Sequence, residues 1–397
     1  MVTMDEKEVA QLVFRGIVGC MTNPILRSLS PLALLLASCG SMISAKGADP
    51  ADAGIAITDV ATFDEPWAMT FLPGTNMALI TEKKGKLKLW TQGTDKTVDV
   101  SGTPTVDYGG QGGFGDVVAS PDFAQSGMVY LSWAEAGEND TRGAVVARAK
   151  LVLGDAPRLE GLSVIWRQFP KVTGRGHYSH RIAFSPDRKY LFISSGERQK
   201  FTPAQDLSAN LGKVIRLLPD GTPAPGNPFE SKGGVSAQIW SYGHRNLLGL
   251  AFSPDGRLWD IEHGPAGGDE INHVEPAKNY GWPLVSDGDH YDGKPIPRNK
   301  TRPDLAQPAI SWNPVIAPGD MIFYTGSAFP QWQGQALIAA LGAGGIVRVK
   351  IDGEKATELE RIDLGNRIRE IEQAPDGTLY VLEDGEGAKL RHVMPKG

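Results

Sequence analysis

The feature that most restricts the fold of this 397-residue chain is a short phrase that recurs along it. Each copy ends one apolar strand, turns through proline followed by Asp or Gly, and begins a second apolar strand. Proline fixes φ at the first corner of such a turn, and Asp or Gly is well tolerated at the second corner. The copies are FLPGTNMALITEKKGKLKLW from Phe71, ASPDFAQSGMVYLSWAE from Ala119, FSPDRKYLFISSGE from Phe184, FSPDGRLWDIEH from Phe252, QAPDGTLYVLED from Gln373 and, more loosely, FPQWQGQALIAAL from Phe329.

Repeated units of about 40 to 50 residues, each with four strands, are typical of a β-propeller. Six phrases therefore predict an all-β, six-bladed β-propeller over residues 53–397, with insertions of variable length between the units. Few segments have the 3.6-residue period of a helix, and the 48 glycines and 28 prolines favour turns. The alternative is a pair of β-sandwich domains. In a propeller, polar loop clusters are candidates for the mouth of the central channel, where ligands bind.

The first 52 residues are expected to lie outside this domain. The stretch SLSPLALLLAS from Ser28 is an apolar run too short to span a bilayer, and it ends at Cys39. Leu36 to Cys39 look like a bacterial lipobox, which predicts a signal peptide over residues 1–39, a lipid anchor at Cys39 and a flexible tether over 40–52. Met21 is a better start for such a signal than Met1. A plain secretory signal cut nearby is the alternative.

Composition excludes several classes of function. The formal net charge of −6 argues against nucleic acid as a partner. Cys20 and Cys39 are the only cysteines, so a domain that starts after them has no disulfide, no cysteine zinc site and no cysteine nucleophile.

Two polar clusters flank the phrases in the middle of the chain. His177 precedes one phrase and Glu197 follows its second strand, so a hairpin would bring them together as a histidine base and its orienting carboxylate. His180 competes for the role of base, and a structural histidine is the alternative. Around the next phrase, Arg245 suits an anionic partner.

That second cluster also carries oxygen donors. The carbonyls of Gly264 and Pro265 and the carboxylates of Asp269 and Glu270 are typical of calcium rather than zinc chemistry, with a solvated acidic loop as the alternative. Elsewhere, Gln111 is the side chain in a glycine-rich turn that could reach a ligand.

A pair of arginines closes this survey of polar residues. Arg367 and Arg369 are two residues apart, so on a strand they face the same way and would suit a ligand with several carboxylates. A pair on an exposed sheet edge is the alternative.

Four of these stretches carry a resemblance to a known family. GQGGFGDV, GHRN followed by GLAFSPDGRLW, EHGPAGGDEIN and KNYGWP resemble the wording of the pyrroloquinoline quinone (PQQ)-dependent soluble aldose sugar dehydrogenases, the glucose/sorbosone dehydrogenase family. The resemblance runs from about Trp67 to Leu390, most of the chain. It implies a six-bladed propeller, PQQ and calcium as cofactors, and oxidation of aldoses to lactones by hydride transfer to the quinone.

The resemblance also assigns roles. His177 would be the general base, Glu197 its orienting carboxylate, and Arg245 the group that stabilises charge on the quinone oxygen. The cofactor contacts that it implies are Gln111, Arg245, Asn246, Tyr291, Ala340, Leu341, Arg367 and Arg369. The calcium ligands that it implies are Gly264 and Pro265 beside the quinone, and Glu270 and Tyr280 at a structural ion. The lipobox predicts a periplasmic location, lipid-anchored at Cys39. A separate electron acceptor is expected, because no Cys-x-x-Cys-His haem motif is present.

Three departures from the family pattern keep other functions open. Ser179 and His180 stand where the family usually has two glycines, Gly342 stands where it often has lysine, and Asp320 adds a carboxylate before Met321. They would fit a divergent substrate, weaker cofactor binding or lost activity. The alternatives are a non-catalytic envelope binding module and a calcium-dependent lactone hydrolase in which His177 activates water.

Overall fold

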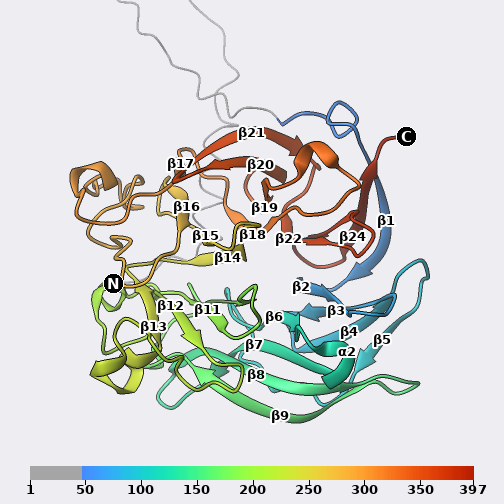
Figure 1. Ribbon diagram of the computed structural model, residues 1–397, viewed down its shortest axis with the longest axis horizontal. Coiled ribbons are helices and arrows are strands. Elements are labelled where there is room, and N and C mark those ends of the chain that lie inside the picture. Colours follow the sequence, from blue (N-terminus) through green and yellow to red (C-terminus); the bar gives the residue numbers. More distant parts are fainter. Residues whose placement is uncertain (1–46) are drawn as a thin grey trace, which may run out of the picture. The chain divides into compact units, whose positions relative to one another are not determined.

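The structure is a computed structural model that describes residues 47–397. It contains six antiparallel sheets of four strands each, which confirms the six-bladed β-propeller (Figure 1). The first two blades are β2 (Pro66–Phe71), β3 (Met77–Glu82), β4 (Lys86–Thr91), β5 (Thr97–Val100), and β6 (Phe114–Ala119), β7 (Met128–Ala136), β8 (Arg142–Val152), β9 (Arg158–Arg167). The next two are β10 (Ser179–Phe184), β11 (Leu191–Ser195), β12 (Lys213–Leu217), β13 (Ile239–Tyr242), and β14 (Leu247–Phe252), β15 (Leu258–Glu262), β16 (Asp269–His273), β17 (Ile310–Trp312). The fifth is β18 (Pro318–Phe323), β19 (Ala336–Ala340), β20 (Gly345–Asp352) and β21 (Lys355–Asp363).

The sixth blade joins the two ends of the described chain. It consists of β22 (Ile368–Gln373), β23 (Leu379–Glu383), β24 (Ala388–Pro395) and, on the outside, β1 (Ile55–Phe63). β1 pairs with β24 from Ile55 opposite Pro395 to Phe63 opposite Ala388, and Figure 1 shows the two strands side by side. The ring of blades is closed, so each sheet packs against another sheet on both sides.

Helices contribute little, as the sequence predicts. The described helices are α2 (Phe123–Ser126) and five 3₁₀ turns, η1 (Thr202–Gln205), η2 (Glu230–Lys232), η3 (Gly234–Gln238), η4 (Asn299–Thr301) and η5 (Pro330–Trp332). Within residues 47–397, none of them is long and apolar enough to cross a membrane. The expected signal peptide and Cys39 lie outside the described residues.

The expected tether is only partly covered by the structure. Ala48 donates a hydrogen bond to the Arg361 carbonyl and accepts one from the Asp363 amide. It thereby pairs with Ile362 of β21. The described end of the stretch 40–52 is therefore packed against a blade rather than free.

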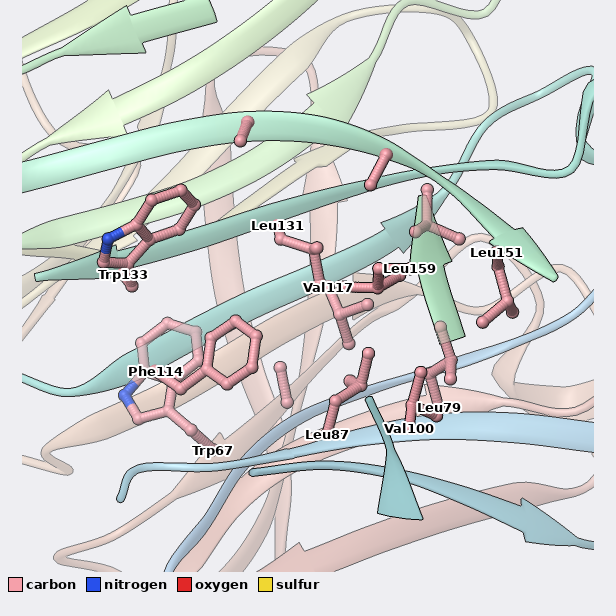
Figure 2. Packing of buried hydrophobic residues seen from close by; sticks show 14 of the residues in the cluster. Trp67, Leu79, Leu87, Val100, Phe114, Val117, Leu131, Trp133, Leu151 and Leu159 are labelled. Carbon is pink, nitrogen blue, oxygen red and sulfur yellow. The ribbon is translucent and has the colours of Figure 1, made fainter. Parts of the chain in front are cut away.

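The core lies between the faces of adjacent blades. Figure 2 shows one such interface, in which side chains of blade one meet those of blade two. Trp67, Leu79, Leu87 and Val100 pack against Phe114, Val117, Leu131, Trp133, Leu151 and Leu159. Each of these side chains is under a tenth exposed. Burial of an apolar side chain stabilises by about 1.5–3 kcal/mol, so these interfaces hold the ring together.

The innermost strands place polar side chains at one mouth of the ring. In every blade the pairing of the first two strands shifts register after the first residue of the innermost strand. Such bulges bend the strand and redirect its side chains. The loops that enter these strands and those that leave the second strands therefore meet at the same end, where the sequence-predicted residues lie.

Candidate active site

His177 and Glu197 form the pair that the sequence predicts. His177 precedes β10 and Glu197 follows β11, and these strands are neighbours in blade three. The Glu197 Oε1 lies 2.5 Å from His177 Nδ1, and both side chains are buried. Burial opposes ionisation of Glu197, but the hydrogen bond from His177 and its charge hold the pKa of this carboxyl below its usual value. An ionised carboxylate fixes the ring's orientation and stabilises its protonated form.

The backbone around His177 is strained. His177, Ser179 and His180 all have left-handed φ values, of 48°, 58° and 67°. Residues with a Cβ rarely take this conformation, which costs about 1–2 kcal/mol each. Gln111 supports the segment, because its Oε1 accepts a hydrogen bond from the His177 amide at 2.7 Å. The strain therefore accompanies the segment that holds His177 beside Glu197.

His180 is not a second base. Its ring is buried, stacks on Trp67 at 5.1 Å between centroids and is 2.8 Å from the Ser132 hydroxyl through Nδ1. Burial, reinforced by the charge of Arg181, lowers the pKa of His180 to about 3, so the ring is neutral. His180 is therefore packed as a neutral, buried ring, whereas His177 is the histidine that is paired with a carboxylate.

Arg245 lies directly beside this pair. The Glu197 amide donates to the Arg245 carbonyl at 2.9 Å, and the Arg245 amide donates to Glu262 Oε2 at 2.6 Å. Its Nη1 donates to the Gly264 carbonyl at 2.7 Å, while its Nη2 lies 3.3 Å from the exposed Tyr291 hydroxyl. Its Nε is buried and has no hydrogen-bond partner among the described residues. A buried donor without an acceptor is costly, so this N–H is suited to an acceptor brought by a ligand.

Asn246 continues the same loop. Its Oδ1 accepts a hydrogen bond from the Ser179 hydroxyl at 3.2 Å, and its carbonyl accepts the His263 amide at 3.0 Å. Ser179, one of the departures from the family pattern, thus orients a predicted cofactor contact.

The other predicted cofactor contacts are brought to the same mouth. Ala340 ends β19 and Leu341 follows it, and both are buried. Arg367 and Arg369 both pair with Asp384, at 3.0 and 2.8 Å. Burial opposes ionisation of Asp384, but the two arginines lower its pKa to about 2. The arginines do face the same way, and the protein already supplies one carboxylate between them.

Three of the four predicted calcium residues, Gly264, Glu270 and Tyr280, line a small cavity. It has a volume of about 20 Å³, which is room for a single water molecule or ion, and its lining includes Arg245, Gly264, Glu262, Glu270 and Tyr280. Tyr280 donates its hydroxyl to the His273 carbonyl and accepts the Glu275 amide at 2.9 Å. The phenol is thus engaged away from Glu270.

Next to this cavity, carboxylates gather. The ligand atoms of His244, Asp260 and Glu262 lie within 4.8 Å of one another. Asn272 Nδ2 bridges the carboxylates of Asp260, Glu262 and Glu270. Burial and the charge of Glu262 raise the pKa of Asp260 and of Glu270 well above the usual values. Among residues 47–397, Asn272 Oδ1 is buried without a hydrogen-bond partner, and Asp260 Oδ2 has an ion-pair contact with His244 Nδ1 at 3.3 Å.

Asp269 is not part of this cluster of oxygen donors. Its two oxygens accept the Gly264 and Ala317 amides at 2.9 and 2.6 Å, which holds the Gly264 turn against the fifth blade. The sequence grouped Asp269 with Glu270 as a metal donor, and the structure assigns it to loop support instead.

An exposed aromatic side chain on the loop that follows Glu197 was missed in the sequence. Glu197 Oε2 accepts the amides of Lys200 and Phe201, both at 2.6 Å. The Phe201 ring is 43% exposed and stacks on Trp282 at 5.5 Å, and Trp282 lies under the Arg245 guanidinium at 5.1 Å. Its position four residues after Glu197 was the available signal.

Four of the six innermost strands carry a charged residue at their third position. Asp116, Arg181, Asp320 and Glu370 hold this position in β6, β10, β18 and β22. Arg181 lies 2.7 Å from Glu370, 3.5 Å from Asp116 and 3.6 Å from Asp320, and 4.1 Å above the Trp67 ring. Asp320, one of the departures from the family pattern, is therefore one of three carboxylates around the Arg181 guanidinium.

Comparisons with known proteins agree with this arrangement. The family model described as glucose/sorbosone dehydrogenase matches residues 63–392. Aldose sugar dehydrogenase YliI of Escherichia coli (strain K12) is 41% identical over 338 residues, 84% of this chain and 91% of that protein. Quinoprotein glucose dehydrogenase B of Acinetobacter calcoaceticus is 26% identical over 83% of this chain and 85% of its own length.

Two solved structures are similar over nearly their whole length. The apo form of the soluble aldose sugar dehydrogenase from Escherichia coli has a TM-score of 0.82, with 40% identity over 86% of this chain and 99% of that one. The PQQ-bound form of the aldose sugar dehydrogenase from Streptomyces coelicolor has a TM-score of 0.71, with 26% identity over 86% of this chain and 98% of that one.

Proposed function

This chain belongs to the glucose/sorbosone dehydrogenase family and is an oxidoreductase of sugars, and from that premise we propose that it oxidises the anomeric carbon of aldoses to lactones with PQQ and calcium. The observation that carries the proposal is the position of the His177–Glu197 pair beside Arg245. A held base and a buried, unpartnered Arg245 N–H meet at one mouth of the channel. The reaction needs one group to take a proton and another to bind a developing negative charge.

His177 would act on the sugar. With Nδ1 held by Glu197, the proton of the anomeric hydroxyl goes to Nε2, the nitrogen on the other side of the ring. Glu197 remains ionised and stabilises the imidazolium that forms. The anomeric C–H bond breaks as hydride while the C–O bond becomes the lactone carbonyl. Exposed Phe201, packed on Trp282, gives the sugar an apolar wall close to the base.

PQQ fits the donors at the mouth. It is a planar tricarboxylate with quinone oxygens, so it needs cationic and N–H donors. Arg245 offers its unpartnered Nε, Asn246 is oriented by Ser179, and Arg367 and Arg369 are two cations that share a single carboxylate. When bound, PQQ supplies the two-electron acceptor for the hydride. Gln111, Tyr291, Ala340 and Leu341 complete the contacts that we propose.

Calcium fits the oxygen donors. The Gly264 carbonyl already accepts a cation, the Arg245 guanidinium, at 2.7 Å, and with Pro265 it would hold the ion that polarises the quinone. Glu270, which lines the small cavity and accepts a hydrogen bond from Asn272, would hold the second, structural ion. Because the Tyr280 phenol is engaged elsewhere, Tyr280 would contribute its main-chain carbonyl.

The cellular setting is proposed from the sequence. Cys39 would carry a lipid anchor that holds the domain at the periplasmic face of the envelope, and electrons would pass to a separate acceptor. Metabolic labelling with a fatty-acid probe tests the anchor, since Cys39→Ser should abolish the label and Cys20→Ser should not.

Kinetics with added cofactors test the function. The purified protein is titrated with PQQ and calcium, and reduction of an artificial electron-accepting dye is followed with a panel of aldoses. We expect saturable PQQ binding and sugar-dependent reduction that His177→Ala lowers by about 10³-fold or more. His273→Ala is the matched control, because His273 pairs with the exposed Glu354 at the far end of β16. PQQ binding without turnover of any aldose would point to the Ser179–His180 change or to an untested substrate. Absence of PQQ binding would support the binding module, and lactone hydrolysis without PQQ would support the hydrolase.

A further inference from the structure

Lys213 is a buried cation that the proposed chemistry does not use. It is the first residue of β12 and its side chain is fully buried. Its Nζ donates to the carbonyls of Leu211, Pro203 and Ala204 at 2.7, 2.8 and 3.0 Å. No carboxylate among the described residues forms an ion pair with it. A buried ammonium is costly, so three hydrogen bonds without a counter-ion call for an explanation.

The position of Lys213 joins the two halves of the active site. In the sheet, its backbone pairs with Ser195 on one side and Tyr242 on the other. Ser195 leads directly to Glu197, and Tyr242 leads directly to Arg245. Its neighbour Gly212 accepts the His244 amide at 3.2 Å.

The side chain of Lys213 makes a second connection between the same segments. Ala204, one of its three carbonyl partners, also accepts the Gly243 amide at 2.9 Å. The ammonium therefore holds η1 against the strand end that carries Arg245. The loop from 197 to 206 is thus held at both ends by buried charges.

At the beginning of the loop 197–206, the Glu197 carboxylate accepts hydrogen bonds from the amides of Gln199, Lys200 and Phe201. At the end of the loop, the Lys213 ammonium donates hydrogen bonds to the Pro203 and Ala204 carbonyls of η1. Between these two points, Arg198, Gln199 and Phe201 have left-handed φ values of about 60°. Such strain persists only where the surroundings impose it.

We propose that Lys213 is a positioning residue that, as its ammonium ion, locks the Glu197 loop to the Arg245 segment and so sets the alkaline limit of the reaction. The inference rests on the proposed function. An ammonium has three N–H donors for three carbonyls, whereas a neutral amine has two donors and a lone pair that faces the third carbonyl. Loss of the proton therefore frees one link of the lock.

The electrostatics place this change near neutrality. Burial, partly offset by the charge of Asp206 on the same loop, lowers the pKa of Lys213 to about 7. The other ionisable side chains of the adjoining segments 197–206 and 242–245 are Glu197, Arg198, Lys200, Tyr242, His244 and Arg245. The lock is complete below the pKa and is lost as the pH rises through it. Global stability changes the other way, because the unfolded chain, with an ordinary lysine pKa, binds the proton up to about pH 10.

The first experiment compares pH profiles. For the wild-type protein loaded with PQQ and calcium, kcat/KM for an aldose should fall about tenfold per pH unit on the alkaline side, while unfolding by urea shows no loss of stability. Lys213→Met should lose about 10- to 100-fold at pH 6 and lack that alkaline fall. Lys350→Met, at an exposed lysine of β20, should keep the wild-type profile. An unchanged alkaline limb in folded Lys213→Met would overturn the proposal.

A second experiment needs neither a variant nor the cofactor. Hydrogen exchange of the wild-type apo protein, corrected for the intrinsic effect of pH, should show about tenfold less protection for residues 197–206 at pH 8.5 than at pH 6. Segments of β20 and β21 should show no change. Equal protection at both pH values would refute the lock whether or not the protein oxidises sugars. Failure of PQQ binding with a pH-dependent loop would instead count against the proposed function alone.

Discussion

Replacing Glu197 by glutamine tests the centre of the proposed site with the smallest possible change. The carboxylate accepts four hydrogen bonds, from His177 Nδ1 and from the amides of Gln199, Lys200 and Phe201. Glutamine has nearly the same shape, but one oxygen becomes an NH₂ group that cannot accept. Whichever way the amide turns, two of the four donors lose their acceptor.

The structure sets the size of the effect. A hydrogen bond to a charged group contributes about 1.5–3 kcal/mol, so two lost bonds remove at least about 3 kcal/mol of local organisation. If the NH₂ group faces His177, the ring must turn its proton to Nε2 and can no longer act as a base. If it faces the loop, Lys200 and Phe201 lose their anchor. At 1.36 kcal/mol per factor of ten, either outcome lowers kcat/KM by at least about 100-fold.

The assay is steady-state dye reduction with PQQ and calcium at saturation, with PQQ affinity measured separately. Glu230→Gln is the matched control, because Glu230 also accepts a backbone amide, that of Gly226, but is exposed on the far part of the same blade. It should retain full activity. If Glu197→Gln kept more than a tenth of the wild-type kcat/KM with an unchanged pH profile, the reasoning about His177 would be wrong.

Other parts of the structure give further expectations. Arg181→Met removes the cation that pairs with Glu370, Asp116 and Asp320. The free energy of unfolding, measured with urea at pH 7, should fall by about 4 kcal/mol. Adding Glu370→Gln should restore part of that loss; a further loss would show that Arg181 does not stabilise these carboxylates. Phe201→Ala should raise the aldose KM several-fold, whereas Phe201→Trp should leave it unchanged, and neither should alter PQQ affinity. An unchanged KM in folded Phe201→Ala would show that Phe201 does not contact the sugar. Burial and the charge of Asp320 raise the pKa of Glu372 to about 8, so the folded state retains a proton that the unfolded chain loses above about pH 4. The free energy of unfolding should therefore fall between about pH 4 and 8, and Glu372→Gln should flatten that slope.

The repeat was enough to predict the architecture. Five of the six phrases contain the turn between the first two strands of a blade, and the looser one from Phe329 contains only the second strand, β19. The apolar spacing identifies the strands. Closure by β1 and β24 could not be predicted, because nothing in the strand between Ile55 and Phe63 names its partner. The ion cluster of Asp116, Arg181, Asp320 and Glu370 could not be predicted either. These residues are far apart in the sequence, and no local pattern connects them.

The site was predictable where a hairpin or a family motif fixed it. His177 and Glu197 flank one hairpin, and the register of that hairpin alone brings them together. Phe201 and Lys213 were missed for a physical reason, because their roles depend on a strained loop whose path is set by hydrogen bonds to Glu197 and to η1. Asp269 was misassigned because a carboxylate that binds backbone amides and one that binds a metal look the same in a sequence.

The outer strand β1 has a consequence for the order of events during synthesis. β1 pairs with β24, from Ile55 opposite Pro395. β1 therefore cannot pair until the ribosome has synthesised β24. Until then, five blades can form while the ring stays open. The apolar face of the first blade that packs against the sixth blade stays uncovered. A contact between opposite ends of a chain is slow to close, since loop-closure entropy opposes it. A ribosome stalled shortly before β24 would hold an open ring that proteases cut, and release of the final segment would close it.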